Sequence, residues 1–255
     1  RWLASAPVVE ATVASRAIAR AQGEIEPAAS EVLTFCPRPA ADGVARLVSY
    51  GAAARAVVLL AGDRLVLAPH EPTDDAPPDI GCTALGHVPV GADAQVLAVG
   101  DDATARFTRA ADEWRALTAA ALAGLAARAL EIGVDYVKER RQFGVPIGSF
   151  QPVGHRLADL ATEVDGATLL WQKAAWALDE ARPEGPKLAR MAFVFAAEVA
   201  QRTALASLHY HGGYGFMLEY DIQLFARRAK AWSLAAGRPA AALDRVADAL
   251  YGEVA

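Results

Sequence analysis

YVKERRQFGVPIGSFQPVGHRLADL, residues 136–160, is the stretch that decides the fold of this 255-residue chain. Its first part continues a long run of helical spacing, and its last part starts a second helix at Pro152. Between them lies a tight turn, Val145–Gly148, because glycine and proline both interrupt helical hydrogen bonding. The stretch therefore predicts two helices joined by a turn, with Arg140 and Arg141 in the last turn of the first helix.

The same helical pattern covers most of the second half of the chain. The first helix is predicted to begin after Asp112, and a later one to end at the Gly212–Gly213 pair. The further helices are predicted over 152–182, 186–211, 219–235 and 239–251. Long helices with short connections are typical of an antiparallel bundle.

Before this bundle, short β-branched runs are separated by Gly, Pro and Asp. AVVLLAGDRLVLAP, residues 56–69, predicts a hairpin that turns at Gly62–Asp63. A single helix is predicted over 7–22. The fold class is therefore α+β, with three parts: a reduced N-terminal helical region at 1–30, a small antiparallel β domain at 31–107 and a helical-bundle domain at 108–255.

Composition excludes several classes of protein. A net charge of -5 and a pI near 5.6 argue against nucleic acid as a partner, because phosphate binding needs a basic face. Two isolated cysteines give no disulfide framework, which favours the cytoplasm. The sequence contains no uninterrupted apolar run of about 18 residues, so we expect no membrane span. RWLASAPVVEA lacks the apolar region of a signal peptide, and the absence of a starting methionine suggests that the chain begins inside a longer protein.

Familiar catalytic and metal-binding motifs are absent from the sequence. There is no G-x-x-x-x-G-K-[ST], no G-x-S-x-G and no H-E-x-x-H. His209 and His211 in HYHGG could approach a metal ion, but the sequence places no third ligand beside them. We therefore expect no metal site.

Arg140 admits two interpretations from the residues alone. A cation in the last turn of a helix offsets the helix dipole, which is an ordinary structural role. Alternatively, the guanidinium donates charge-assisted hydrogen bonds to a phosphate, with Phe143 beside it as a flat apolar surface. Gly212 and Gly213 are ambiguous in the same way, because glycine ends a helix at no steric cost and also lets backbone approach a ligand closely.

The order of these pieces resembles the C-terminal helical domain of the acyl-CoA dehydrogenase family. That family shows Y-x-x-x-R-x-x-F-G-x-P-I-x-x-F-Q, later G-G-x-G, then E-Y-P and R-D-A-K. This chain has YVKERRQFGVPIGSFQ and then LHYHGGYGFMLEYDIQLFARRAK, residues 208–230, within a match of about residues 112–238. The resemblance implies an N-terminal helical domain, a middle β domain and a C-terminal four-helix bundle.

The resemblance also implies FAD, bound between the β domain and the bundle at a subunit interface. In the family, these motifs contact the ADP portion of the neighbouring subunit's FAD. Carried over position by position, the cofactor-binding residues are Arg140, Gln142, Phe143, Gln151, His209, Gly212 and Gly213. His209 stands where many relatives have glutamine; imidazole can still donate a hydrogen bond, but its charge depends on pH.

The chain departs from the family at both positions that hold a catalytic base. One is a Glu six residues after the Lys of R-D-A-K, and counting from Lys230 gives Ala236. The other, on the first helix of the bundle, falls on Trp114, and neighbouring Glu113 is turned away by about 100°. Neither a methyl group nor an indole can remove the α proton of an acyl thioester. The resemblance therefore implies no catalytic residue in this chain.

These losses affect the chain's own active site, whereas the motifs that reach across the interface are kept. We therefore expect a subunit of a heteromeric FAD-dependent acyl-CoA dehydrogenase, an oxidoreductase that desaturates the α,β CH–CH bond of an acyl-CoA thioester. Heteromeric members of the family are known for bulky or sterol-derived thioesters. The expected partner is a homologous catalytic subunit that binds most of the acyl-CoA, in a heterotetramer, and the chain alone is expected to be inactive.

Two other interpretations stay open. The first is an active homomeric acyl-CoA dehydrogenase with a non-standard base, for which Glu219 and Asp221 are the nearest candidates, although Glu219 matches the family's structural E-Y pair. The second is a non-enzymatic helical interaction subunit without FAD. The retained cofactor motifs argue against it, because a scaffold has no need of them.

Overall fold

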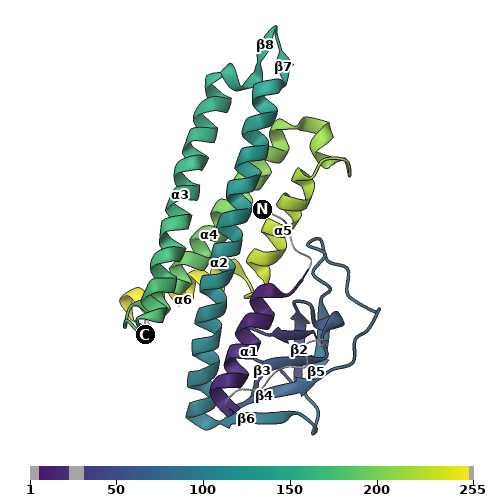
Figure 1. Cartoon of the computed structure of the whole chain (residues 1–255), viewed down its shortest axis with the longest axis vertical. Helices are drawn as coiled ribbons and strands as arrows, with labels where there is room; N and C mark the ends of the chain where they lie inside the picture. Colours follow the sequence, from purple (N-terminus) through teal and green to yellow (C-terminus); the bar gives the residue numbers. More distant parts are fainter. Residues whose placement is uncertain (1–5, 23–31, 253–255) are drawn as a thin grey trace. The chain divides into compact units, whose positions relative to one another are not determined.

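The computed structural model describes residues 6–22 and 32–252 and divides the chain into two compact units (Figure 1). Among the described residues, the helical unit contains 116–234 and 239–252, and the β unit contains 6–22, 32–115 and 235–238. The signal-like RWLAS and the end of the predicted segment 1–30 lie outside the described residues. Each unit is described here by itself.

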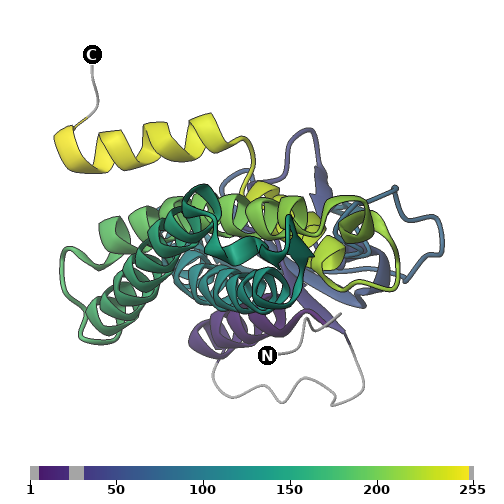
Figure 2. The ribbon, with the colours of Figure 1, turned by 90° about the horizontal axis from the view of Figure 1, so that it is seen from above.

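The helical unit contains the end of α2 (Gly100–Glu139), α3 (Gln151–Asp179), α4 (Gly185–Tyr210), α5 (Ile222–Leu234) and α6 (Pro239–Tyr251). Helix α4 lies at the centre, because it packs against α3, α5 and α6, and Figure 2 shows α3 and α4 side by side. Prolines in the first turns of α3 and α4 start them as predicted, since a proline there loses no helical hydrogen bond. The predicted helical bundle is confirmed.

A close crossing joins α2 to α4. A Cβ at Gly133 would lie within 2.4 Å of the Ser207 hydroxyl, so only glycine fits there without movement. The Ser207 hydroxyl donates a hydrogen bond of 2.7 Å to the carbonyl oxygen of Ala129 on the facing helix. The Ser207 hydroxyl and the missing side chain of Gly133 together set how closely α2 approaches α4. This contact lies about one helical turn before Tyr136.

The joint between α2 and α3 differs from the predicted one. Helix α2 ends at Glu139, so Arg141 lies outside the helix, in the short hairpin of β7 (Arg141–Gln142) and β8 (Val145–Pro146). The hairpin turns at Phe143 and Gly144, both with positive φ, a combination typical of two-residue hairpin turns of type I′. The short 3-10 helix η2 (Ile147–Ser149) then leads into α3. The sequence alone placed the turn two residues too late.

Helix α2 is, within the described residues, the one helix long and apolar enough to cross a membrane. An 18-residue window in it has a mean hydropathy of 1.5, and 44% of that window is buried. Length and composition alone are weak evidence for a membrane span, because the core helix of a globular protein meets the same criteria.

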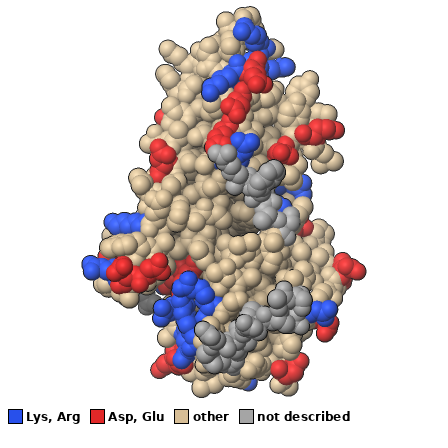
Figure 3. Space-filling model, viewed as in Figure 1, with Lys and Arg blue, Asp and Glu red and all other residues tan. Residues whose placement is uncertain are grey.

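On the face drawn in Figure 3, basic and acidic groups lie beside one another and form no continuous basic surface.

The β unit is built on a four-stranded sheet in the order β1-β3-β4-β6. A second sheet pairs β2 with β5. The strands are β1 (Leu33–Phe35), β2 (Val44–Val48), β3 (Ala56–Ala61), β4 (Arg64–Pro69), β5 (Gly86–Pro89) and β6 (Gln95–Val99). All pairs are antiparallel except β1 with β3, which is parallel. Periodicity shows which face of a strand is buried but not which strand it pairs with, so the wholly antiparallel expectation was wrong for this pair.

The predicted hairpin between β3 and β4 is confirmed. Ala61 pairs with Arg64 across the two-residue turn, and Gly62 adopts a φ of 60°. Glycine tolerates this conformation because it has no Cβ. The inward residues of both strands, including Val57, Leu59 and Val66, form the core of the sheet.

Helix α2 begins at Gly100, twelve residues before the predicted start. Its first turn carries Asp101 and Asp102, whose charges favour a helix N-terminus. Phe107 is buried against Phe35 of β1, with ring centroids 5.8 Å apart. The buried positions in this part, Ala103, Phe107, Ala110, Ala111 and Trp114, repeat at helical spacing. The predicted start of this helix after Asp112 was therefore wrong.

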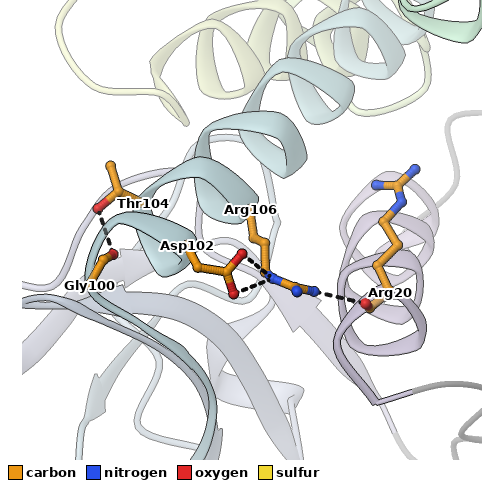
Figure 4. A network of polar contacts seen from close by, with 5 residues as sticks. All are labelled: Arg20, Gly100, Asp102, Thr104 and Arg106. Carbon is orange, nitrogen blue, oxygen red and sulfur yellow. Dashed lines mark hydrogen bonds and ion pairs between the residues drawn. The ribbon is translucent and has the colours of Figure 1, made fainter.

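Helix α1 (Val8–Gln22) packs against β1 with Val13, Ala14, Ala17 and Ile18 buried. Figure 4 shows how its end is tied to the start of α2. The Arg106 guanidinium donates to both Asp102 oxygens, at 2.9 and 2.8 Å, and to the carbonyl oxygen of Arg20 at 2.8 Å. Arg106 therefore satisfies a carbonyl at the C-terminal end of α1, where helical partners run out.

Candidate functional site

A cavity of about 360 Å³ lies in the helical unit at the end of α2. It is lined by Tyr136, Glu139, Arg140, Tyr214 and Tyr220. Tyr214 belongs to η3 (Gly212–Phe216), which follows α4 directly. The structure therefore brings two distant predicted elements together: Arg140, and the turn that begins at Gly212 and Gly213.

The Arg140 guanidinium is exposed and available to a ligand. Its centre lies 6.0 Å from the centroid of the Tyr214 ring, at the outer limit of a cation–π contact. Within residues 6–22 and 32–252, no side chain or carbonyl accepts a hydrogen bond from it, and it forms no ion pair. An unpaired guanidinium beside an aromatic ring suits an anionic group such as a phosphate. Glu139 is the one carboxylate among the residues that line the cavity.

Glycine suits the turn at Gly212, whose φ of 59° favours a residue without a Cβ. At Gly213 a Cβ would have no atom within 4 Å, so the space beside its backbone is open. Both residues are exposed, so their backbone is open to a ligand. A phosphorylated cofactor therefore fits these residues: a cation without a protein partner and aromatic rings line one cavity, and an exposed glycine backbone directly precedes Tyr214 in its lining.

The remaining predicted cofactor residues are exposed and do not line the cavity. Phe143 is 92% exposed at the tip of the β7–β8 hairpin with a φ of 52°, a conformation that costs free energy for a residue with a Cβ. The Gln142 side-chain amide donates to the carbonyl oxygen of Arg141 at 2.7 Å. Gln151 begins α3, and His209 lies in the last turn of α4. Their roles stay predictions.

His211 lies two residues after the predicted His209, and the sequence suggests for it only the role of a metal ligand. It is 4% exposed, and its Nδ1 lies 2.7 Å from the carbonyl oxygen of Ser207. A carbonyl only accepts, so Nδ1 carries the hydrogen. His209 is exposed. In the part of the chain that the structure describes, no three His, Cys, Asp or Glu side chains are grouped to hold a metal ion.

The two positions predicted to lack a catalytic base lie in the β unit. Ala236 is 8% exposed, and Trp114 is 1% exposed. Glu113 forms ion pairs with Arg20 at 2.5 Å, Arg16 at 3.4 Å and Arg109 at 3.8 Å. The Glu113 carboxylate is therefore engaged in ion pairs with three arginines.

Glu10 on α1 is a carboxyl group that sequence reasoning missed. The Trp114 indole donates to its Oε1 at 3.4 Å. Burial raises the pKa of Glu10 above its ordinary value of 4.5, and hydrogen bonds to the backbone and to Trp114 oppose that rise only in part. The two residues are 104 positions apart, so no local pattern could have joined them.

Glu10→Gln is expected to stabilise the β unit at neutral pH. A raised pKa in the folded state means that Glu10 stabilises the fold below pH 4.5 and loses this contribution as pH rises through its folded pKa. The variant should therefore unfold at a higher temperature than the wild type near pH 8, and the difference should shrink as pH falls toward 4.5. Thermal unfolding followed across this pH range measures it. An equal difference at every pH would contradict the assignment.

The family model of the acyl-CoA dehydrogenase C-terminal domain matches residues 104–251. The chain belongs to the acyl-CoA dehydrogenase family. Members of this family use FAD, in agreement with the fit of a phosphorylated cofactor at Arg140. The match begins within α2 and ends in α6, so it includes the cavity and every predicted cofactor residue.

Curated relatives agree with this assignment. The chain is 41% identical over 132 residues to the probable acyl-CoA dehydrogenase YngJ of Bacillus subtilis, which covers 52% of this chain and 34% of the relative. It is 38% identical over 116 residues to the cyclohex-1-ene-1-carbonyl-CoA dehydrogenase of Syntrophus aciditrophicus. That match covers 46% of this chain and 28% of the relative. The chain thus spans about a third of the length of the curated relatives it matches.

Solved structures resemble a larger part of the chain. A chain of the ChsE4-ChsE5 complex from Mycobacterium tuberculosis superposes with a TM-score of 0.85 at 25% identity, over 99% of this chain and 78% of that one. A chain of the Tcur3481-Tcur3483 steroid acyl-CoA dehydrogenase, a G363A variant, gives a TM-score of 0.81 at 26% identity. The superposition covers 96% of this chain and 76% of that one. The predicted acyl-CoA dehydrogenase-like fold is therefore confirmed, including the β unit.

Proposed function

We propose that this chain is the partner-dependent subunit of a heteromeric acyl-CoA dehydrogenase that desaturates the α,β bond of an acyl-CoA thioester. It contributes Arg140 and the Gly212–Gly213 turn to an FAD at the subunit interface, and it supplies no catalytic base. The observation that carries the proposal is the cavity that Arg140, without an ion-pair partner in the described residues, lines together with Tyr214 of the glycine turn, while Ala236 and Trp114 stand at the positions where the family has its base.

The chain's own residues would bind and orient the cofactor. FAD, when bound, supplies the hydride acceptor for the desaturation. Arg140 would donate charge-assisted hydrogen bonds to a phosphate oxygen, because its fork of N–H groups matches that geometry. The exposed backbone of Gly212 and Gly213 would approach the ADP portion closely, and Gln142, Phe143, Gln151 and His209 would add contacts from the surrounding surface.

Two structural neighbours support a heteromeric partner of the same family. One is described as a complex of ChsE4 with ChsE5, and the other as a steroid acyl-CoA dehydrogenase of two chains, Tcur3481 and Tcur3483. We propose by analogy a homologous catalytic partner, assembly as a heterotetramer and a bulky or sterol-derived acyl group. The cytoplasm remains the expected location.

Co-expression with a homologous acyl-CoA dehydrogenase tests the proposal directly. The chain alone should purify without flavin and should not turn over acyl-CoA, because it lacks a base. The complex should hold flavin, and a sterol-type acyl-CoA should bleach its absorbance. The matched control is the catalytic homologue expressed alone, which should hold less flavin than the complex.

Each alternative gives a different result in the same experiment. Flavin and turnover in the isolated chain would favour an active homomer, in which Glu219→Gln and Asp221→Asn would then identify the base. Flavin absent from chain and complex alike would favour a non-enzymatic interaction subunit. A complex that reduces only straight-chain acyl-CoA would keep the assembly and overturn the sterol-type substrate.

A further inference from the structure

His211 and Tyr136 form a stacked pair beneath the cavity. Their ring centroids lie 3.9 Å apart with an interplanar angle of 23°. The Tyr220 ring meets the imidazole edge-on at 5.9 Å and contacts Tyr214 at 5.8 Å. Offset stacked and edge-on arrangements are the favourable geometries for aromatic pairs. His211 is therefore the centre of an aromatic cluster whose outer members line the cavity.

Each ring of the stack is connected to one of the two groups proposed to bind FAD, which are Arg140 and the Gly212–Gly213 turn. The backbone N–H of Arg140 donates to the carbonyl oxygen of Tyr136 at 2.9 Å, so Tyr136 lies one helical turn before the cation. His211 directly precedes Gly212, and its ring donates to the carbonyl oxygen of Ser207 in the last turn of α4. The Tyr136 hydroxyl also donates to the carbonyl oxygen of His211 at 3.5 Å.

These contacts join the ends of two helices, α2 and α4. Without the stack, each end would still be helical, because its backbone hydrogen bonds lie within its own helix. What the stack adds is a link between the end of α2, which carries Arg140, and the residue that directly precedes the Gly212–Gly213 backbone. A binding site whose groups are held in position loses less free energy to ordering when a ligand binds.

We propose that His211 is a positioning residue, which through its stack on Tyr136 holds Arg140 and the Gly212–Gly213 turn at the separation that FAD requires. This inference rests on the proposed function and adds a residue that touches no cofactor itself. Its ring acts through contact area, so an aromatic ring of similar size should replace it.

A double-mutant cycle on the co-expressed complex tests this role through the dissociation constant of FAD. Arg140→Ala and His211→Ala should each weaken FAD binding about tenfold to a hundredfold, since a charge-assisted hydrogen bond contributes about this range of affinity. If His211 acts through Arg140, the double variant should bind FAD about as weakly as Arg140→Ala alone. His211→Phe should restore binding to within about twofold, because it keeps the stack.

The outcomes separate positioning from other roles. Additive losses in the double variant, or failure of His211→Phe to rescue, would overturn the positioning role while the proposed function stands. No loss with Arg140→Ala would overturn the proposed function itself. His155→Ala, which removes an exposed histidine of α3, is the matched control and should bind FAD normally. Should His211→Ala not fold, Tyr136→Leu removes the stack from its other side and should give the same non-additive loss.

Discussion

Arg140→Ala is expected to weaken flavin retention by the complex about tenfold to a hundredfold while each subunit stays folded. A charge-assisted hydrogen bond contributes about 1.5–3 kcal/mol, and each 1.4 kcal/mol is a factor of ten in affinity. The side chain is exposed and makes no hydrogen bond to the described residues, so its removal leaves no protein group without a partner. Flavin content after gel filtration, and FAD titration of the stripped complex, measure the loss.

Arg141→Ala is the control for this variant. Arg141 is the neighbouring exposed arginine, and its guanidinium donates to the carbonyl oxygen of Gly144 at 3.3 Å, within its own hairpin. Removing it changes the net charge by the same amount, so a general electrostatic effect would appear in both variants. Arg140→Lys should fall between wild type and alanine, because lysine keeps the charge and loses the planar fork. Equal flavin retention by the Arg140→Ala and Arg141→Ala complexes would show that Arg140 does not bind the cofactor.

Gly86→Ala is expected to lower the free energy of unfolding of the β unit by about 3 kcal/mol, the upper range for overpacking a core. Gly86 is buried in β5, and a Cβ there would lie 2.5 Å from both the Ala52 nitrogen and the Gly51 carbonyl carbon. These are backbone atoms of η1 (Gly51–Ala53), so no side chain can turn aside to relieve the clash. Thermal unfolding together with amide hydrogen exchange of β3 and β4 would report it.

Gly124→Ala provides the matched substitution with the opposite sign. Gly124 is exposed in the middle of α2, and a Cβ there would have no atom within 4 Å. Alanine should therefore raise the free energy of unfolding by up to about 1 kcal/mol through helix propensity. If Gly86→Ala melted at the wild-type temperature while Gly124→Ala melted higher, the close approach of β5 to η1 would be refuted.

Local backbone chemistry made the helical unit predictable from sequence. Pro152, Pro186 and the Gly212–Gly213 pair act within a single turn, so the ends of α3 and α4 follow from them. The start of α2 was missed because β6, residues 95–99, passes directly into the helix at Gly100, with no connecting loop to mark the boundary. The parallel pairing of β1 with β3 depends on contacts between distant segments, which no periodicity encodes.

The residues of the candidate site also divide into those that the sequence predicted and those that only the structure revealed. Arg140 and the glycine turn could be named because each belongs to a motif, and their meeting at one cavity was implied by the family resemblance. The stack of Tyr136 on His211 joins residues 75 apart, and Trp114 reaches Glu10 across 104. Packing in three dimensions creates these pairs, so single-residue patterns give no sign of them.

The 40-residue length of α2 has a practical consequence for dissecting the protein. The division between the two units falls inside this helix, after Arg115, and not in a connecting loop. A fragment that starts at residue 116 would begin with a severed helix whose first four amide N–H groups have no helical partner. Chimeras that graft this helical unit onto a relative should therefore exchange the segment from Gly100 onward as one piece.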